Sequence, residues 1–267
     1  MATIETHKPG SFCWIELGTT DQAAAKCFYA SLFGWGANDF PMGPSEVYSI
    51  FNLNGRQTSG GYTLRPDMLQ HGIPPHWMLY VLVDSADDAA ARATAAGAQV
   101  MAGPFDVGDF GRMAVLMDPT GAAISVWQVK RQPDTHQAGI GVAGEPGAFC
   151  WADLMTRDVA AAKRFYETMF GWRLSPGEHD SSGYLHIQNG SAFIGGVPPS
   201  EYMPANVPPH WLLYFQVVDC DQATAKAQEL GARVYRQPVS MENVGRWSVI
   251  GDPQGAVLAL FEPARRS

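Results

Sequence analysis

Two acidic residues at matching positions of short apolar stretches are the first candidates for chemistry. Glu16 lies in the stretch FCWIELG, and Asp153 lies in FCWADLM. A carboxylate on a largely apolar strand should be paired or functional, because burying an unpaired charge is costly. General acid–base catalysis is one such function. A salt bridge to Arg112 or Arg246 is the structural alternative.

Each carboxylate has a histidine and a tyrosine at corresponding positions further along the chain. The motif Pro-Pro-His-Trp contains His76 and recurs with His210, and Tyr80 and Tyr214 follow four residues later. These histidines and tyrosines could polarise a substrate, and a tyrosine could donate to a ligand carbonyl. Backbone hydrogen bonding is the alternative for both residue types. The candidate catalytic residues are Glu16, Asp153, His76 and His210.

These candidates occur twice because the sequence is a tandem duplication. The segment from Phe12 to Trp35 matches the segment from Phe149 to Trp172 without a gap, at an offset of 137 residues (149 minus 12). Self-similarity at a domain-sized period indicates two related domains and not a solenoid. The length of 267 residues also suits two domains of about 130 residues. We expect a first domain over 1–130, a linker over 131–146 and a second domain over 147–267.

Each repeat is predicted to contain two β-α-β-β-β units. Strands are inferred from alternating apolar residues, helices from Ala-rich segments with a cap and a closing glycine, and turns from Asn-Gly and Asp-Pro-x-Gly. The predicted fold class is therefore α+β, with four βαβββ units in two tandem domains. In the first repeat we expect a strand over 12–17, a helix over 23–33 capped by Thr20, strands over 47–53, 57–64 and 77–83, a helix over 86–96, and strands over 113–117 and 122–128.

The helix ending FYxxxFGW and the DPxG turn before the last strand resemble the vicinal oxygen chelate superfamily. This group includes glyoxalase I, bleomycin-resistance proteins and extradiol dioxygenases. The resemblance covers nearly the whole chain, twice over. The paired FCW and PPHW motifs are similar to tandem-domain bacterial members described as glyoxalase-like or hydroxylase. The resemblance implies curled mixed sheets that form a cleft, with metal ligands on cleft-facing strands in the metal-dependent members.

The resemblance defines three metal-ligand positions in each repeat, and none of them holds a ligand in this sequence. Zinc and similar ions need three or four His, Cys, Asp or Glu side chains. We therefore expect no metal and no other cofactor. The residues at these positions are Trp14, Met78 and Ser125 in the first repeat and Trp151, Leu212 and Ala259 in the second.

A shift of two residues in this alignment would preserve the strand faces and select other residues. It would pair Glu16 with His76, or Asp153 with His210. Each pair would still lack a third ligand on the last strand. The candidates there are Ala123, Trp127, Val257 and Phe261.

The predicted strand faces give each repeat a cleft rich in aromatic residues. Aromatic walls with a few polar groups are typical of small-molecule sites, although Trp14 and Trp151 could instead fill collapsed cores. The Gly60-Gly61 and Gly195-Gly196 pairs indicate a strand bulge or a close backbone approach. The expected ligand-binding residues are Trp14, Met78, Tyr80, Ser125 and Trp127, and in the second repeat Trp151, Leu212, Tyr214 and Phe261. Phe12, Phe149 and Ala259 are also expected to face the clefts.

The leading hypothesis is metal-independent binding of a small aromatic or hydrophobic molecule, resembling sequestration by bleomycin-resistance proteins. The alternative is a small-molecule enzyme of the glyoxalase, lyase or hydroxylase type, with Glu16 or Asp153 as the general base. A metal-dependent glyoxalase or dioxygenase is a version of this alternative. A third hypothesis makes one repeat active and the other a structural partner.

Charge and composition limit the partners. The formal charge of −8 and the lack of a basic stripe argue against nucleic acid. No segment suggests a signal peptide or a membrane span, and the four cysteines form no CxxC pair, so we expect a cytoplasmic protein. We expect a monomer with an intramolecular pseudo-dimer, or a weak homodimer.

Overall fold

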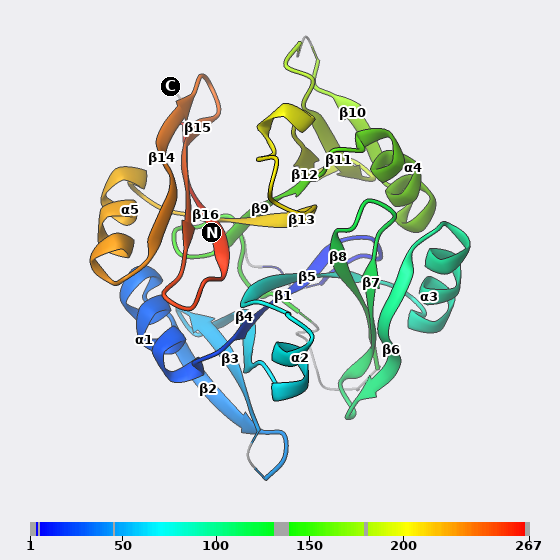
Figure 1. The fold of residues 1–267 in the computed structure, drawn as a ribbon, viewed down its shortest axis with the longest axis horizontal. Coiled ribbons are helices and arrows are strands. Elements are labelled where there is room, and N and C mark those ends of the chain that lie inside the picture. Colours follow the sequence, from blue (N-terminus) through cyan, green and yellow to red (C-terminus); the bar gives the residue numbers. More distant parts are fainter. Residues whose placement is uncertain (1–3, 5, 45, 131–138, 179–180, 265–267) are drawn as a thin grey trace.

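Two eight-stranded mixed sheets, one from each repeat, form the protein (Figure 1). The first sheet has the order β2-β3-β4-β1-β5-β8-β7-β6, and the second repeats it as β10-β11-β12-β9-β13-β16-β15-β14. This arrangement confirms the predicted α+β class with four βαβββ units. The structure is a computed structural model that describes residues 4, 6–44, 46–130, 139–178 and 181–264.

The elements follow the predicted order. The first repeat contains β1 (Phe12–Thr19), α1 (Gln22–Phe33), β2 (Gly36–Pro41), β3 (Val47–Leu53), β4 (Arg56–Thr63), α2 (Pro66–Gln70), β5 (His76–Leu82), α3 (Ala86–Ala95), β6 (Gln99–Val107), β7 (Gly111–Met117) and β8 (Ala123–Val129). The second contains β9 (Phe149–Met155), α4 (Val159–Phe170), β10 (Arg173–Pro176), β11 (Leu185–Asn189), β12 (Ala192–Val197), a 3-10 turn (Ser200–Tyr202), β13 (His210–Gln216), α5 (Cys220–Glu229), β14 (Arg233–Met241), β15 (Gly245–Gly251) and β16 (Val257–Pro263).

In the first repeat, strands β2 and β6 and the short helix α2 were not predicted, and one helix cap was assigned to the wrong residue. Strand β2 is exposed along its whole length and β6 along most of its length, so neither has the alternating burial on which the prediction depends. The cap of α1 is Asp21 and not Thr20, since the Asp21 carboxylate accepts a hydrogen bond from the backbone N–H of Ala24. The predicted closing glycine is correct, because Gly34 has the left-handed conformation with φ 77°.

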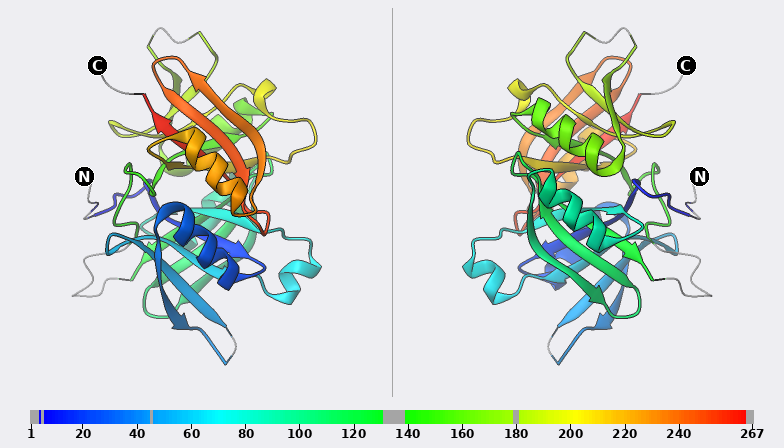
Figure 2. Two further views of the ribbon diagram at one scale, coloured as in Figure 1. Left: turned by 90° about the vertical axis from the view of Figure 1, so that its left-hand side faces the viewer. Right: turned by 90° about the vertical axis from the view of Figure 1, so that its right-hand side faces the viewer.

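The helices cover the outer flanks and pair across the repeats. Helix α1 packs beside α5 on one flank, and α3 packs beside α4 on the other (Figure 2). Each flank therefore combines a helix from one repeat with a helix from the other. None of the described helices has the length and apolar character that crossing a membrane requires.

An aromatic core joins the two sheets. The ring of Phe12 lies 6.3 Å from that of Phe149, 5.4 Å from Trp172 and 5.7 Å from Trp211, measured between centroids. The prediction that Phe12 and Phe149 face the clefts is wrong. An irregularity in strand pairing after each phenylalanine turns it to the opposite face from Trp14 or Trp151.

Buried tyrosine–aspartate pairs also connect the repeats. The hydroxyl of Tyr29 donates to Asp252 Oδ2 at 2.9 Å, and Tyr166 donates to Asp118 Oδ2 at 2.8 Å. The other oxygen of each aspartate accepts backbone N–H groups of its own turn, so the turn role predicted for these aspartates is confirmed. The FY motif of each repeat therefore completes the DPxG turn of the other.

The predicted linker lies partly outside the described residues. Its described part, 139–146, packs against the first repeat: Ile140 is buried, its N–H donates to the Cys13 carbonyl, and Glu145 pairs with Arg56. The proposed domain boundaries themselves stay a prediction.

Candidate functional site

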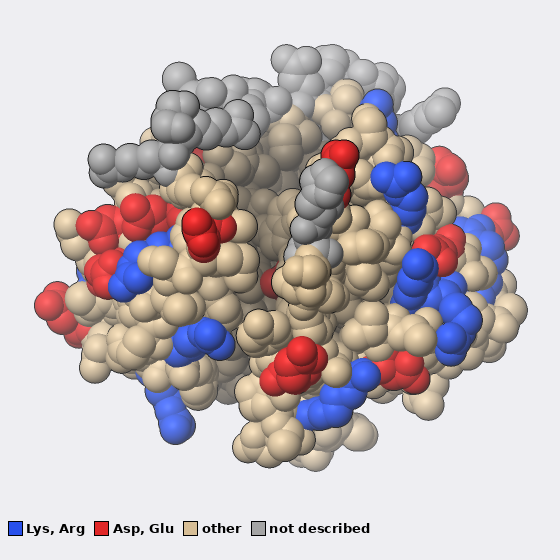
Figure 3. Space-filling view, turned by 90° about the horizontal axis from the view of Figure 1, so that it is seen from above, with Lys and Arg blue, Asp and Glu red and all other residues tan. Residues whose placement is uncertain are grey.

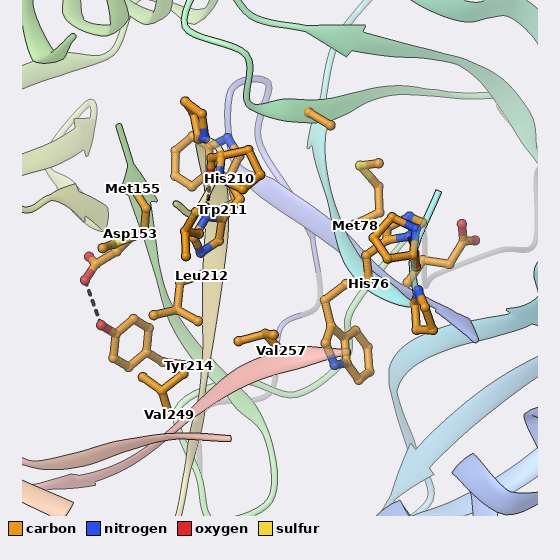
Figure 4. Close-up of a pocket in the computed structure, with 18 of the residues that line it drawn as sticks. His76, Met78, Asp153, Met155, His210, Trp211, Leu212, Tyr214, Val249 and Val257 are labelled. Carbon is orange, nitrogen blue, oxygen red and sulfur yellow. Dashed lines mark hydrogen bonds between the residues drawn. The ribbon is translucent and has the colours of Figure 1, made fainter. Parts of the chain in front are cut away.

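One large cavity of about 2500 Å³ is lined by both repeats. Glu16 from the first repeat and Asp153 from the second border the same space. Figure 3 shows the molecule hollowed on one face, with mainly uncharged atoms around the hollow and charged side chains on the outer surface. In Figure 4, Asp153 and Tyr214 lie on one side of the pocket and His76 and Met78 on the other. The two predicted clefts are therefore parts of one continuous space.

A half-buried carboxyl group and two phenols form the polar centre of the first repeat. Tyr48 donates to Glu16 Oε1 at 2.7 Å, and Tyr80 donates to Glu16 Oε2 at 2.7 Å. The indole of Trp14 donates to the Tyr48 hydroxyl at 2.9 Å. Burial raises the pKa of Glu16, and the two phenol hydrogen bonds oppose this shift without cancelling it.

The second repeat reproduces this cluster around Asp153. Tyr184 donates to Asp153 Oδ1 at 2.6 Å, and Tyr214 donates to Oδ2 at 2.9 Å. The indole of Trp151 donates to the Tyr184 hydroxyl at 2.8 Å and to Asp153 Oδ1 at 3.1 Å. Burial again raises the pKa of the carboxyl group. Both clusters can therefore hold a proton at a pH where an exposed carboxyl would have lost it.

Glycines in the neighbouring strands make room for these clusters. Gly60 pairs with Glu16 in the parallel β1–β4 register, and Gly196 pairs with Asp153 in the parallel β9–β12 register. A Cβ on Gly60 would lie 2.0 Å from the Tyr48 hydroxyl oxygen, and one on Gly196 would lie 1.8 Å from that of Tyr184. The close approach predicted for the glycine pairs is confirmed at these two positions.

The salt bridges proposed from the sequence for the two carboxylates are wrong. Arg112 pairs with Asp87 at 2.7 Å, and Arg246 pairs with Asp221 at 2.6 Å. The carboxylates are satisfied by tyrosines instead.

Two of these tyrosines, Tyr48 and Tyr184, were missed by sequence reasoning. A signal for them exists, because Tyr48 and Tyr184 recur at an offset of 136 residues (184 minus 48), the same offset as Gly60 and Gly196.

The two candidate histidines both line the cavity. Nδ1 of His76 lies 2.8 Å from the Pro74 carbonyl oxygen, and Nδ1 of His210 lies 2.9 Å from that of Pro208, as the backbone-bonding alternative anticipated. Burial lowers the pKa of both imidazoles. A carbonyl can only accept, so Nδ1 carries the proton and Nε2 is the acceptor in the neutral ring.

Most of the predicted site residues border the cavity. Trp14 and Trp127 do not: Trp14 supports Tyr48, and Trp127 packs over Gly111. Ser125 is fully buried and does not border it either. Their roles in binding, like those of the others, stay predictions. The predicted residues that line the cavity are Glu16, His76, Met78, Tyr80, Trp151, Asp153, His210, Leu212, Tyr214 and Phe261.

The residues of the site do not fit the metal that some members of this fold hold. In the first sheet, Trp14 pairs with Tyr80, and Tyr80 pairs with Ser125 across β1, β5 and β8. At the equivalent positions of the second sheet, Trp151 pairs with Tyr214, and Tyr214 pairs with Ala259. Within the described ranges, no three His, Cys, Asp or Glu side chains gather in a way that could hold an ion. Indole, phenol, hydroxyl and methyl groups do not supply the required donor set.

Replacing Glu16 by Gln is expected to change the pH dependence of stability. The pKa of the Glu16 carboxyl is raised in the native state. The native state therefore holds the carboxyl proton more tightly than the unfolded chain, in which a glutamate has a pKa of about 4.3. The stabilising contribution is present below that pH and is lost as the pH rises toward the native pKa.

Urea denaturation at pH 5 to 8 measures this effect. The Glu16→Gln variant should gain stability relative to the unmutated chain as the pH rises. Asp87→Asn is the control without a pH-dependent effect, because hydrogen bonding to Arg112 lowers the pKa of exposed Asp87 and this carboxyl is therefore ionised in both states above pH 5. Parallel profiles for Glu16→Gln and the unmutated chain would contradict the raised pKa.

The chain belongs to the Glyoxalase/Bleomycin resistance protein/Dioxygenase superfamily, which matches residues 11–126 and again 148–260. Among its relatives is the protein named "Putative glyoxylase CFP32" from Mycobacterium tuberculosis (strain CDC 1551 / Oshkosh), which is 40% identical over 262 residues, or 97% of each chain. The "Anthracycline biosynthesis protein DnrV" of Streptomyces peucetius is 33% identical over 268 residues, which cover 95% of this chain and 94% of DnrV.

Solved structures share the fold at low sequence identity. The Mn(II)-bound glyoxalase from Novosphingobium aromaticivorans has a TM-score of 0.60 and 16% identity, with coverage of 96% of this chain and 82% of the glyoxalase. The 2,3-dioxygenase LapB from Pseudomonas sp. KL28 has a TM-score of 0.60 and 13% identity, with coverage of 97% and 95%. At these identities the likeness shows the fold alone.

Proposed function

We propose that the chain binds a small aromatic or hydrophobic molecule in the shared cavity without a metal ion. The observation that carries this proposal is an extensive, mainly apolar cavity with two carboxyl–phenol clusters at its wall. Apolar walls supply affinity, and a few fixed polar groups orient the ligand. The relative named for anthracycline biosynthesis supports a ligand with aromatic rings.

The size of the cavity favours a large ligand or one ligand in each repeat. Sites for drug-sized molecules usually occupy about 300–1,000 Å³, whereas this space measures about 2500 Å³. The polar groups around it include the acceptor Nε2 atoms of His76 and His210 and the phenols of Tyr80 and Tyr214. A planar molecule with hydroxyl or carbonyl substituents would match this mixture of groups.

Titration calorimetry with a panel of planar aromatic compounds, such as naphthoquinones and anthraquinones, tests the proposal. We expect saturable binding that is unchanged after treatment with EDTA. The absence of binding across the panel would refute the proposal. Binding that is lost with EDTA and restored by manganese or zinc would refute its metal-independent part.

Filling the cavity is expected to weaken this binding. Met78 is half-buried on the cavity wall, and its strand neighbour is Glu16. Met78→Trp should occupy ligand space and raise the Kd at least about tenfold, a loss of about 1.4 kcal/mol. Val218→Trp is the matched control, because Val218 is 77% exposed and lies outside the cavity lining. An unchanged Kd for Met78→Trp would show that ligands bind elsewhere.

Proton-transfer catalysis is the second candidate function. It is favoured by the raised pKa values of Glu16 and Asp153 in the cavity, because perturbed carboxyl groups gather at functional sites. Either carboxylate could accept a proton from a bound substrate and return it to another atom of the same molecule. Measuring the exchange of substrate hydrogen for solvent deuterium in bound compounds tests this candidate. Exchange should disappear in the matching Gln or Asn variant while binding persists.

A further inference from the structure

The two halves of the cavity differ in their outer walls. In the second repeat, β14 and β15 place Arg236 and Trp247 on the lining. The corresponding lining residues of the first repeat, at an offset of 134 residues (247 minus 113), are Ala102 and Met113. The strand pairing agrees with this correspondence, since Arg236 and Ala102 both pair with a valine of the next strand. The duplication has therefore given one half of the cavity a cation and an indole where the other half has two apolar side chains.

The guanidinium of Arg236 lies over the Trp247 ring, with Cζ 4.5 Å from the ring centroid. The Trp247 ring in turn lies 6.1 Å from the ring of Tyr214, whose hydroxyl bonds to Asp153. A continuous aromatic wall therefore runs from the buried carboxyl group to an exposed cation. Cation–π stacking holds the planar guanidinium in place without using its N–H donors.

The positive charge on this wall is not neutralised within the described part of the chain. Neither Arg236 nor the nearby Arg233, which stacks on Tyr235 at 5.2 Å, has an acidic partner among the described residues. Arg246, on the adjacent strand, is by contrast held by Asp221 through two hydrogen bonds. The donors of Arg236 are therefore available to an anion that enters the cavity.

The acidic residues that border the cavity do not cancel the attraction of Arg236 for an anion. Glu16 and Asp153 are bound to tyrosines, and their pKa values are raised. Glu46 and Glu242 are exposed, where water and salt screen their charges. An anion stacked against Trp247 would meet the guanidinium directly.

We propose that the second repeat binds a planar aromatic compound carrying a carboxylate, with its ring against Trp247 and Tyr214 and its carboxylate on Arg236. A guanidinium presents parallel N–H donors that match the two oxygens of a carboxylate. The proposal rests on the proposed binding function and adds the charge of the ligand and the repeat that holds it. Met113 and Ala102 provide neither contact in the first repeat.

Matched pairs of ligands test this assignment. Calorimetry should compare anthraquinone-2-carboxylate and 2-naphthoate with their neutral primary amides. For the unmutated chain we expect the acids to bind more tightly than the amides and to lose affinity as the salt concentration rises. Arg236→Ala, which installs the residue of the first repeat, should weaken the acids at least about tenfold, or 1.4 kcal/mol, and change the amides less than about twofold.

Arg246→Ala is the control, because Arg246 lies outside the cavity lining and pairs with Asp221. It should leave the affinities of both ligands unchanged. Equal binding of acids and amides, or equal weakening of both by Arg236→Ala, would overturn the anion assignment while leaving the proposed function intact. Failure of the unmutated chain to bind either ligand would overturn both proposals.

Discussion

Replacing Asp252 by alanine is expected to lower the free energy of unfolding by about 3–5 kcal/mol. Oδ1 of Asp252 accepts the backbone N–H groups of Gln254, Gly255 and Ala256, and Oδ2 accepts the Tyr29 hydroxyl. Alanine would leave all four donors without this acceptor, and Asp252 is only 3% exposed, so water cannot easily replace it. The loss combines a broken turn with a broken contact between the repeats.

Urea denaturation of three variants measures this loss. Asp252→Asn retains an oxygen for the backbone donors and should lose only about 1–2 kcal/mol. Asp118→Ala removes the equivalent contact with Tyr166 and should match Asp252→Ala. Glu242→Ala, at an exposed turn, should change the stability by less than about 0.5 kcal/mol. A loss below 1 kcal/mol for both aspartate-to-alanine variants would show that these contacts do not hold the repeats together.

Adding one methyl group at Gly196 is expected to disrupt the Asp153 cluster. The new Cβ would lie 1.8 Å from the Tyr184 hydroxyl oxygen and 2.1 Å from Cζ of the same ring. The ring must move away, which breaks its hydrogen bonds to Asp153 and Trp151. We expect Gly196→Ala to cost about 2–4 kcal/mol of stability, as an overpacked site that also loses buried hydrogen bonds. Aromatic ligands should bind at least about tenfold more weakly.

A double-mutant cycle separates this clash from a general effect of alanine. Once Tyr184→Ala has removed the ring, adding Gly196→Ala should cost less than about 0.5 kcal/mol. Gly36→Ala is the matched strand control, because no heavy atom lies within 4 Å of its Cβ position and its φ is not positive. If Gly196→Ala destabilised the chain equally with and without the Tyr184 ring, the clash would not be the cause.

The architecture could be predicted because its sequence signals occur in both repeats. The helix stop at Gly34 and the turn at Asp118 have local causes, a left-handed residue and a side chain that caps its own turn. Both features recur in the second repeat, and both were correctly predicted. The exposed strand β2 could not be found in the same way, because no buried face produces an alternating pattern.

The candidate site was only half predictable. Glu16 and Tyr80 lie on adjacent strands at positions that strand alternation places on the cleft face, so both were proposed. Tyr48 reaches Glu16 from β3, two strands away from β1 in the sheet order, and it does so over Gly60. Such a contact depends on the register of three strands and on the absence of one side chain. The turned Phe12 depends on an irregularity of strand pairing that alternation alone does not reveal.

The tyrosine of each repeat binds the aspartate of the other. This exchange of contacts fits an origin by gene duplication and fusion. In a protein with one repeat, the tyrosine and its aspartate acceptor would face the matching groups of a second copy, and a two-fold axis would form both contacts at once. Gene duplication and fusion convert that concentration-dependent association into an intramolecular one. Fusion also frees each half from being identical to the other. The arginine at 236 and the alanine at 102 are a difference that only the fused form allows within one molecule.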